Sequence, residues 1–211
     1  MSNHPMAPVR GGRTPFPLRI SLSGLGLAGA VPKDDLGHAL DGDLTLRRTA
    51  DGWLEPGSGS MLLADGSDRR PDLVLGMECR YVGSGVDGQS LGLILHKDAD
   101  NWTKIEYVLA DAAQDYFVLR FTKKEAGSES VFDQLGMSGL SRNGGGVEVE
   151  VASRDNSKIY SLFVAIANGT SFGAGDRNRG GQGLGTAKIG IVRGGTYSAT
   201  DGFQIRRVAA L

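Results

Sequence analysis

The sequence predicts an all-β protein of about ten to twelve strands, arranged as two packed antiparallel sheets or a barrel. Three observations predict this class. Apolar and polar residues alternate with a period of two in many short runs, which is typical of strands with one buried face. Turn-forming clusters such as DGD, EPGSGS, GSGVDG and RNGGG separate these runs. The 211 residues also include 33 Gly and 7 Pro, which disfavours a helical bundle because both residues destabilise helices.

In chain order, the sequence predicts a Pro-rich N-terminal arm at residues 1–17 and a single β-sandwich domain at residues 18–211. Residues 33–40 are expected to form one short helical turn. The alternation predicts strands at residues 18–23, 44–47, 73–81, 91–97, 102–109, 116–122, 147–151, 159–166, 187–192 and 203–206. The glycine-rich segment 173–185 is predicted to be a loop, either a phosphate cradle or a mobile tip.

The charge balance argues against two classes of partner. The chain carries 23 basic and 24 acidic side chains, so it lacks the basic excess expected of a protein that binds nucleic acid or an anionic membrane surface. Its N-terminus has no apolar segment of the kind that directs secretion, so we expect cytoplasmic synthesis without such a signal. The single cysteine, Cys79, lies in an apolar strand pattern and is expected to be a buried, unreactive thiol.

One predicted hairpin places a group of polar and aromatic side chains on one face. Pairing Leu95 with Ile105 and Leu93 with Tyr107 puts the apolar residues of both strands on the core side, and it leaves a three-residue turn in which Asn101 adopts the left-handed conformation. The opposite face, continued on the next strand, is then the candidate ligand-binding face. Its residues are His96, Trp102, Lys104, Glu106, Tyr116 and Arg120.

Three interpretations of this face remain open. Aromatic rings beside hydrogen-bonding side chains suit the faces and hydroxyls of sugars. The same residue types are enriched at protein interfaces. A third interpretation is a second buried layer under a loop.

Several segments resemble the concanavalin A-like lectin/glucanase superfamily, in particular its small non-lectin modules. The run LGLILHKDADNWTKIEYV, followed by YFVLRF, is similar to the central hairpin of that superfamily. LDGDLTLRR resembles an early strand, and AKIGIVRGG with DGFQIRR resembles the closing pair, so the resemblance spans residues 40–208. It implies a jelly roll of two curved antiparallel sheets, with ligands on the concave sheet or its rim loops. Members include lectins, glycoside hydrolases, virion proteins and structural domains, so the fold leaves the function open.

Other motifs favour structural interpretations. Residues 24–29 match G-x-G-x-x-G, but no helix pattern follows and Pro32 interrupts the segment, so a flexible loop is expected and no cofactor. Asp98, Asp100 and Asn101 offer oxygen ligands for calcium, yet tight turns select the same residues, and we predict no metal. The paired carboxylates Glu148 and Glu150 are expected on a solvated face rather than in a glycosidase site.

The sequence therefore predicts no catalytic residues and a non-catalytic binding or structural module, with surface carbohydrate as a candidate ligand. It is expected to be a subunit of a homo-oligomer or larger assembly, such as a decoration, tail or receptor-binding protein on a phage virion surface. Neighbouring protein subunits and a glycan are the expected partners, without nucleic acid or membrane insertion. The alternative is a glycoside hydrolase of the same superfamily, for which Glu106 is the strongest carboxylate candidate in the hairpin.

Overall fold

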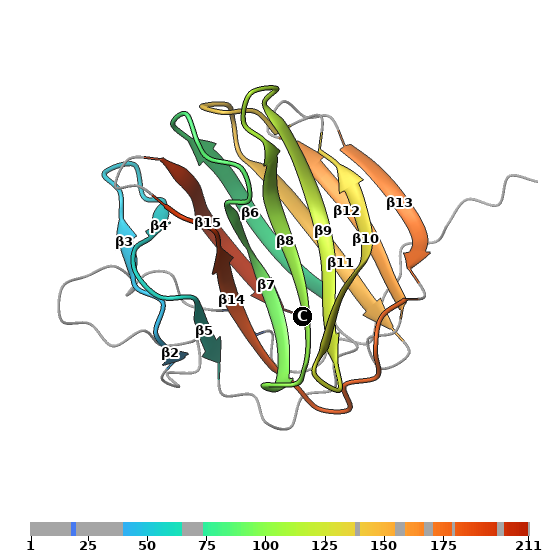
Figure 1. Cartoon of the computed structure of the whole chain (residues 1–211). Coiled ribbons are helices and arrows are strands. Elements are labelled where there is room, and N and C mark those ends of the chain that lie inside the picture. The colour runs from blue at the N-terminus through green and yellow to red at the C-terminus, as the bar shows by residue number, and fades with distance from the viewer. Residues whose placement is uncertain are drawn as a thin grey trace, which may run out of the picture.

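Two antiparallel sheets stack face to face in the computed structural model (Figure 1). The structure describes residues 18–19, 40–64, 74–137, 140–154, 159–166, 171–178, 180–197 and 201–210. No helix in those ranges is long and apolar enough to span a membrane. The two-sheet antiparallel sandwich is thus confirmed over the barrel. The arm at residues 1–17 and the glycine motif at 24–29 lie outside the described residues, as does the helical turn predicted at 33–40 except for Leu40, which is in a strand.

One sheet has eight strands. Its order is β13-β12-β11-β6-β15-β4-β3, and β1 pairs with β15 beside that path. The bounds are β1 Leu18–Arg19, β3 Leu46–Arg48, β4 Leu54–Pro56, β6 Val74–Val82, β11 Val147–Arg154, β12 Ile159–Ile166, β13 Ser171–Asn178 and β15 Gly202–Ala210.

The other sheet has seven strands, in the order β10-β9-β8-β7-β14-β5-β2. Figure 1 shows its strands β14, β7, β8, β9 and β10 side by side in front of the eight-stranded sheet. The bounds are β2 Leu40–Gly42, β5 Met61–Ala64, β7 Ser90–Asp98, β8 Asn101–Asp111, β9 Tyr116–Glu125, β10 Ser128–Gly136 and β14 Lys188–Gly194.

The core lies between the sheets, because the inward residues of both sheets form one continuous apolar cluster. Tyr81 and Phe203 from the eight-stranded sheet meet Phe117 from β9, with ring centroids 4.8–5.9 Å apart. Tyr107 on β8 is fully buried, and its hydroxyl lies 3.3 Å from the Met77 carbonyl and 3.2 Å from the Val147 carbonyl of the facing sheet. This hydroxyl joins the two sheets by hydrogen bonds through the core.

Cys79 belongs to the same core. Its side chain is fully buried, which confirms the predicted burial, and that burial raises the pKa of the thiol well above its ordinary value.

The predicted register of the β7–β8 hairpin is wrong by two residues. Leu93 pairs with Ile105 and Leu95 with Thr103. The turn is shorter than predicted, and Asn101 does not adopt the predicted left-handed conformation. One residue of the shift comes from the turn, because Asp98 pairs with Asn101, and the other comes from an irregularity between His96 and Asp98 that adds a residue to β7. A shift of two preserves the faces of a strand, so the predicted grouping of side chains by face survives.

Five strands do not follow the predicted pattern. β2, β4, β5 and β10 were not among the strands predicted from the alternation, and β13 occupies the first part of the segment predicted as a loop at residues 173–185. The alternation along β10 is broken by a bulge at Phe132, where the pairing shifts between Val131 and Asp133. For β13, backbone pairing with β12 outweighs the low strand propensity of its glycines.

The remainder of the segment 173–185 is held against the end of the seven-stranded sheet. The buried side chain of Gln182 donates from Nε2 to the backbone carbonyls of Trp102 and Lys124, at 2.6 Å each. Leu184 is buried in the core. The described part of this segment, from Gly180 onward, therefore closes the end of the sandwich rather than forming a free tip.

Candidate functional site

The outer face of the seven-stranded sheet brings most of the predicted residues together. Backbone register places His96 directly opposite Trp102 and Glu106 directly opposite Arg120. Lys104 lies between Trp102 and Glu106 on the same side of β8, because alternate residues of a strand point to the same face. The flanking Ile105 and Tyr107 belong to the core, so this face is the one turned away from the other sheet.

Trp102 contributes to a second apolar cluster on this face. The cluster comprises Leu63, Ile94, Trp102 and Val192, with Met61 packed against it. Trp102 is only 8% exposed, and the Lys104 ammonium lies 4.4 Å from the centroid of its ring. This contact is a cation–π interaction, so the Lys104 amine occupies a position beside the aromatic ring.

Glu106 is the most unusual group of the face. Its side chain is 7% exposed, and one carboxylate oxygen accepts a hydrogen bond of 2.8 Å from the Ser90 hydroxyl. Burial raises the pKa of Glu106 above its ordinary value, while Lys104, the Ser90 hydroxyl and Arg120 oppose that rise. The residue opposite Glu106 on β7 is Gly92, which places no side chain beside it.

Arg120 and Tyr116 lie toward the edge of the sheet. The Arg120 Nε donates to Gln134 Oε1 on β10 at 3.1 Å. Tyr116 is 48% exposed. Its hydroxyl lies close to Gly136 on β10, since a Cβ added at that glycine would be 3.2 Å from it. Tyr116 pairs with Asp111 beyond an irregularity in β8, so it lies further along the sheet than Arg120. The ligand-binding role of the six residues stays a prediction.

The remaining predicted groups behave as follows. His96 is half-buried, and desolvation lowers its pKa against the opposing effect of Asp98. The Asp98 Oδ1 accepts from Asn101 Nδ2 and from the Asp100 backbone N–H, at 2.9 Å each, and these bonds lower the pKa of Asp98. These contacts match the turn interpretation of this segment.

No group of three or more His, Cys, Asp or Glu side chains within the described ranges is placed to hold a metal ion. Glu148 is half-buried, and the side chain of Glu150 lies outside the described part of the structure.

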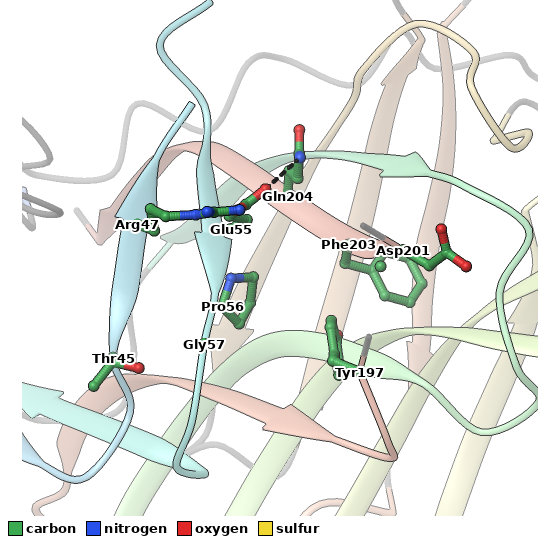
Figure 2. Close-up of a pocket in the computed structure, with 10 residues that line it drawn as sticks. Thr45, Arg47, Glu55, Pro56, Gly57, Tyr197, Asp201, Phe203 and Gln204 are labelled. Carbon is green, nitrogen blue, oxygen red and sulfur yellow. Dashed lines mark hydrogen bonds and ion pairs between the residues drawn. The ribbon is translucent and has the colours of Figure 1, made fainter. Parts of the chain in front are cut away.

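A separate hollow of about 420 Å³ was missed by sequence reasoning (Figure 2). It lies where β4 and β15 diverge, and its lining residues come from segments far apart in the chain. They are Thr45, Arg47, Glu55, Pro56, Gly57, Tyr197, Asp201, Gly202, Phe203 and Gln204. The only sequence signal was the pair of turn-rich segments around Gly57 and Gly202, which does not reveal that these segments meet.

Comparison with known proteins yields structural matches alone. No protein-family model and no curated protein sequence matches this chain. The Lotus tetragonolobus seed lectin superposes with a TM-score of 0.57 at 10% identity, over 82% of this chain and 92% of the lectin. The winged bean acidic lectin, complexed with methyl-α-D-galactose, gives 0.55 at 12% identity, over 81% of this chain and 91% of the lectin.

An enzyme structure matches over a smaller part of its length. The GH43 protein BlXynB from Bacillus licheniformis gives a TM-score of 0.51 at 8% identity, over 73% of this chain, and this chain spans 30% of that protein. Identities this low bear on the fold alone. The chain has the concanavalin A-like jelly-roll sandwich fold that these lectins share.

Proposed function

We propose that this chain is a non-catalytic carbohydrate-binding module, with the sugar bound around Glu106 on the outer face of the seven-stranded sheet. The observation that carries the proposal is the buried Glu106 carboxylate on the side of the sheet turned away from the core. Burying a carboxylate costs free energy, so a group kept there, beside cationic neighbours, is a candidate for a binding role.

The chemistry of the neighbours suits sugar hydroxyls. A hydroxyl both donates and accepts hydrogen bonds, so it can donate to the Glu106 carboxylate and accept from Lys104 or Arg120. Arg120 lies directly opposite Glu106, and Lys104 is two residues away on the same face of β8. The lectins that share the fold, one of them complexed with a galactose derivative, support carbohydrate as the class of ligand.

A glycan array tests this site. We expect the wild-type protein to bind a subset of glycans and the Glu106→Gln and Arg120→Ala variants to bind them at least about tenfold more weakly. Lys123→Ala is the matched control, because Lys123 lies on β9, the strand that also holds Arg120, and forms an ion pair with the exposed Glu125. Wild-type protein that binds no glycan, or variants that bind like the wild type, would contradict the proposal.

We also propose that the module is a subunit of a larger assembly, such as a phage decoration, tail or receptor-binding protein, anchored through residues 1–17. The prolines of that segment favour an extended arm of the kind that docks on a neighbouring subunit. Deleting residues 2–17 is expected to abolish association with the particle or closed oligomer, as measured by native mass. An unchanged assembly after deletion would contradict the anchoring role.

A glycoside hydrolase is the second candidate, and the raised pKa of Glu106 favours it. A general acid must hold a proton near neutral pH, and burial is the usual cause of such a shift. Glycosidases need a second carboxylate within about 5–10 Å, and Glu129 is the carboxylate whose negative charge helps to raise the pKa of Glu106.

Assays of reducing-sugar release on the glycans that bind distinguish the two functions. The binding module releases no sugar. Release that Glu106→Gln or Glu129→Gln abolishes would establish catalysis.

A further inference from the structure

The hollow between β4 and β15 is created by the way these strands separate. They pair at Ile205 and Leu54, and beyond that point β4 continues to Pro56, which has no N–H to extend the ladder. The opening leads between the strands toward Tyr197 (Figure 2). A gap of about 420 Å³ is within the size range of small-molecule sites.

The floor of this hollow is apolar and fixed in place. The Tyr197 hydroxyl donates to the Ser90 carbonyl at 2.6 Å, and the Arg193 guanidinium lies 4.4 Å from the centroid of the Tyr197 ring. Arg193 also donates to the Gly57 carbonyl, which ties the end of β14 to the chain beyond β4. The Tyr197 ring is thus oriented before any ligand arrives, with Pro56 as a second apolar wall.

The rim of the hollow carries an ordered row of polar groups. Arg47 pairs with Glu55 across the β3–β4 hairpin, and the other Glu55 oxygen accepts from Gln204 Nε2 at 3.1 Å. Arg80 Nε donates to Gln204 Oε1 at 2.8 Å, which fixes the orientation of the Gln204 amide. The Arg47 side chain remains 70% exposed at the mouth.

Asp201 lies on the opposite side of the hollow from Arg47, as Figure 2 shows. Its carboxylate accepts from the Ser84 hydroxyl at 2.9 Å. The lining side chains include two carboxylates, those of Glu55 and Asp201, and one guanidinium, that of Arg47, and this balance disfavours a phosphate or another anion. An aromatic floor with a rim of planar donors and acceptors instead matches a neutral ring that carries hydroxyls.

We propose that this hollow is a second binding site, and that it takes one neutral monosaccharide unit. The apolar face of the sugar ring packs against Tyr197 and Pro56, and its hydroxyls bond to the Arg47–Glu55–Gln204 row. The proposal rests on the proposed function for the class of ligand. The strands that line the hollow belong to the other sheet, and none of the lining residues is among the six of the outer face. Ser90 links the two sites, because its carbonyl accepts from Tyr197 and its hydroxyl donates to Glu106.

Saturation-transfer NMR tests the site with free glucose, galactose, mannose, N-acetylglucosamine and fucose as the probes. We expect signal transfer to at least one sugar, with affinity at least about tenfold lower in Arg47→Ala, whose exposed side chain is removed without disturbing the core. Arg48→Ala is the matched control, since Arg48 is the next residue on β3 and does not line the hollow. All of these proteins also carry Glu106→Gln, so that transfer reports the hollow alone, and Arg48→Ala should then bind like its parent.

The possible results separate this site from the site around Glu106. No transfer to any of the five sugars overturns the second site, and so does transfer that Arg47→Ala preserves. If monosaccharide transfer fails while the array shows glycan binding that depends on Glu106, only the second site is lost. If the array fails and monosaccharides bind in an Arg47-dependent manner, the site around Glu106 is lost and the second site stands.

Discussion

Glu106 makes the pH dependence of stability testable at a single residue. Because burial raises the pKa of its carboxyl in the folded state, the folded protein holds this proton more tightly than the unfolded chain. The contribution to the free energy of unfolding is fully present below the ordinary pKa, and it is lost as the pH rises through the raised value. Glu106→Gln carries no titrating group and keeps a side-chain oxygen that can accept from Ser90.

We therefore expect Glu106→Gln to gain stability relative to the wild type as the pH rises above the ordinary pKa of a glutamate side chain, as measured by urea unfolding. A stability difference that stays constant as the pH rises, or that changes in favour of the wild type, would show that the Glu106 carboxyl is not raised in pKa. That result would also remove the observation that favours the hydrolase alternative.

Glycines inside strands set how closely the strands of the seven-stranded sheet approach. A Cβ added at Gly92 would lie 2.1 Å from the Ile105 carbonyl oxygen, so β7 and β8 would have to separate. We expect Gly92→Ala to lower the free energy of unfolding by about 1–3 kcal/mol, because the crowding is against backbone. The control is Gly136→Ala on β10, whose three nearest contacts are all with the exposed Tyr116 side chain, the hydroxyl being nearest at 3.2 Å.

Chemical denaturation of both glycine variants measures this effect. Equal losses at the two positions would mean that the cost comes from the alanine itself rather than from the contact between β7 and β8.

Sequence periodicity predicted most strands, because one face of each is buried and the alternation records it. It failed where burial and backbone pairing depend on partners distant in the chain. The bulge at Phe132 interrupts the alternation along β10, so that strand was not predicted. The glycine-rich β13 forms a strand because its backbone pairs with β12. The hairpin register was wrong by two residues because neither the shorter turn nor the added residue in β7 has a signature in the alternation.

The candidate sites differ in the same way. The predicted side chains lie on one face because alternation along β8 is a local property, so Trp102, Lys104 and Glu106 could be grouped in advance. The burial of Glu106 and the position of the Lys104 amine over Trp102 depend on packing between strands. The hollow at Tyr197 joins residues more than a hundred positions apart, and only the fold brings them together.

At the scale of the whole molecule, the Tyr107 hydroxyl links the two sheets within the core. Tyr107→Phe removes the hydrogen bond to the Met77 and Val147 carbonyls while keeping the ring, and we expect the free energy of unfolding to fall by about 1 kcal/mol. Tyr116→Phe, at an exposed tyrosine of the same sheet, should leave stability unchanged. Thermal or urea unfolding measures both, and equal effects would show that the bond between the sheets contributes nothing.

The most direct test of the whole proposal is calorimetric titration of the wild-type protein and Glu106→Gln with a glycan selected on the array, with the same mixtures assayed for released sugar. A carbohydrate-binding module binds the glycan, loses at least about tenfold in affinity on Glu106→Gln, and releases no reducing ends. Binding that is unchanged by Glu106→Gln, or sugar release by the wild type, would contradict it.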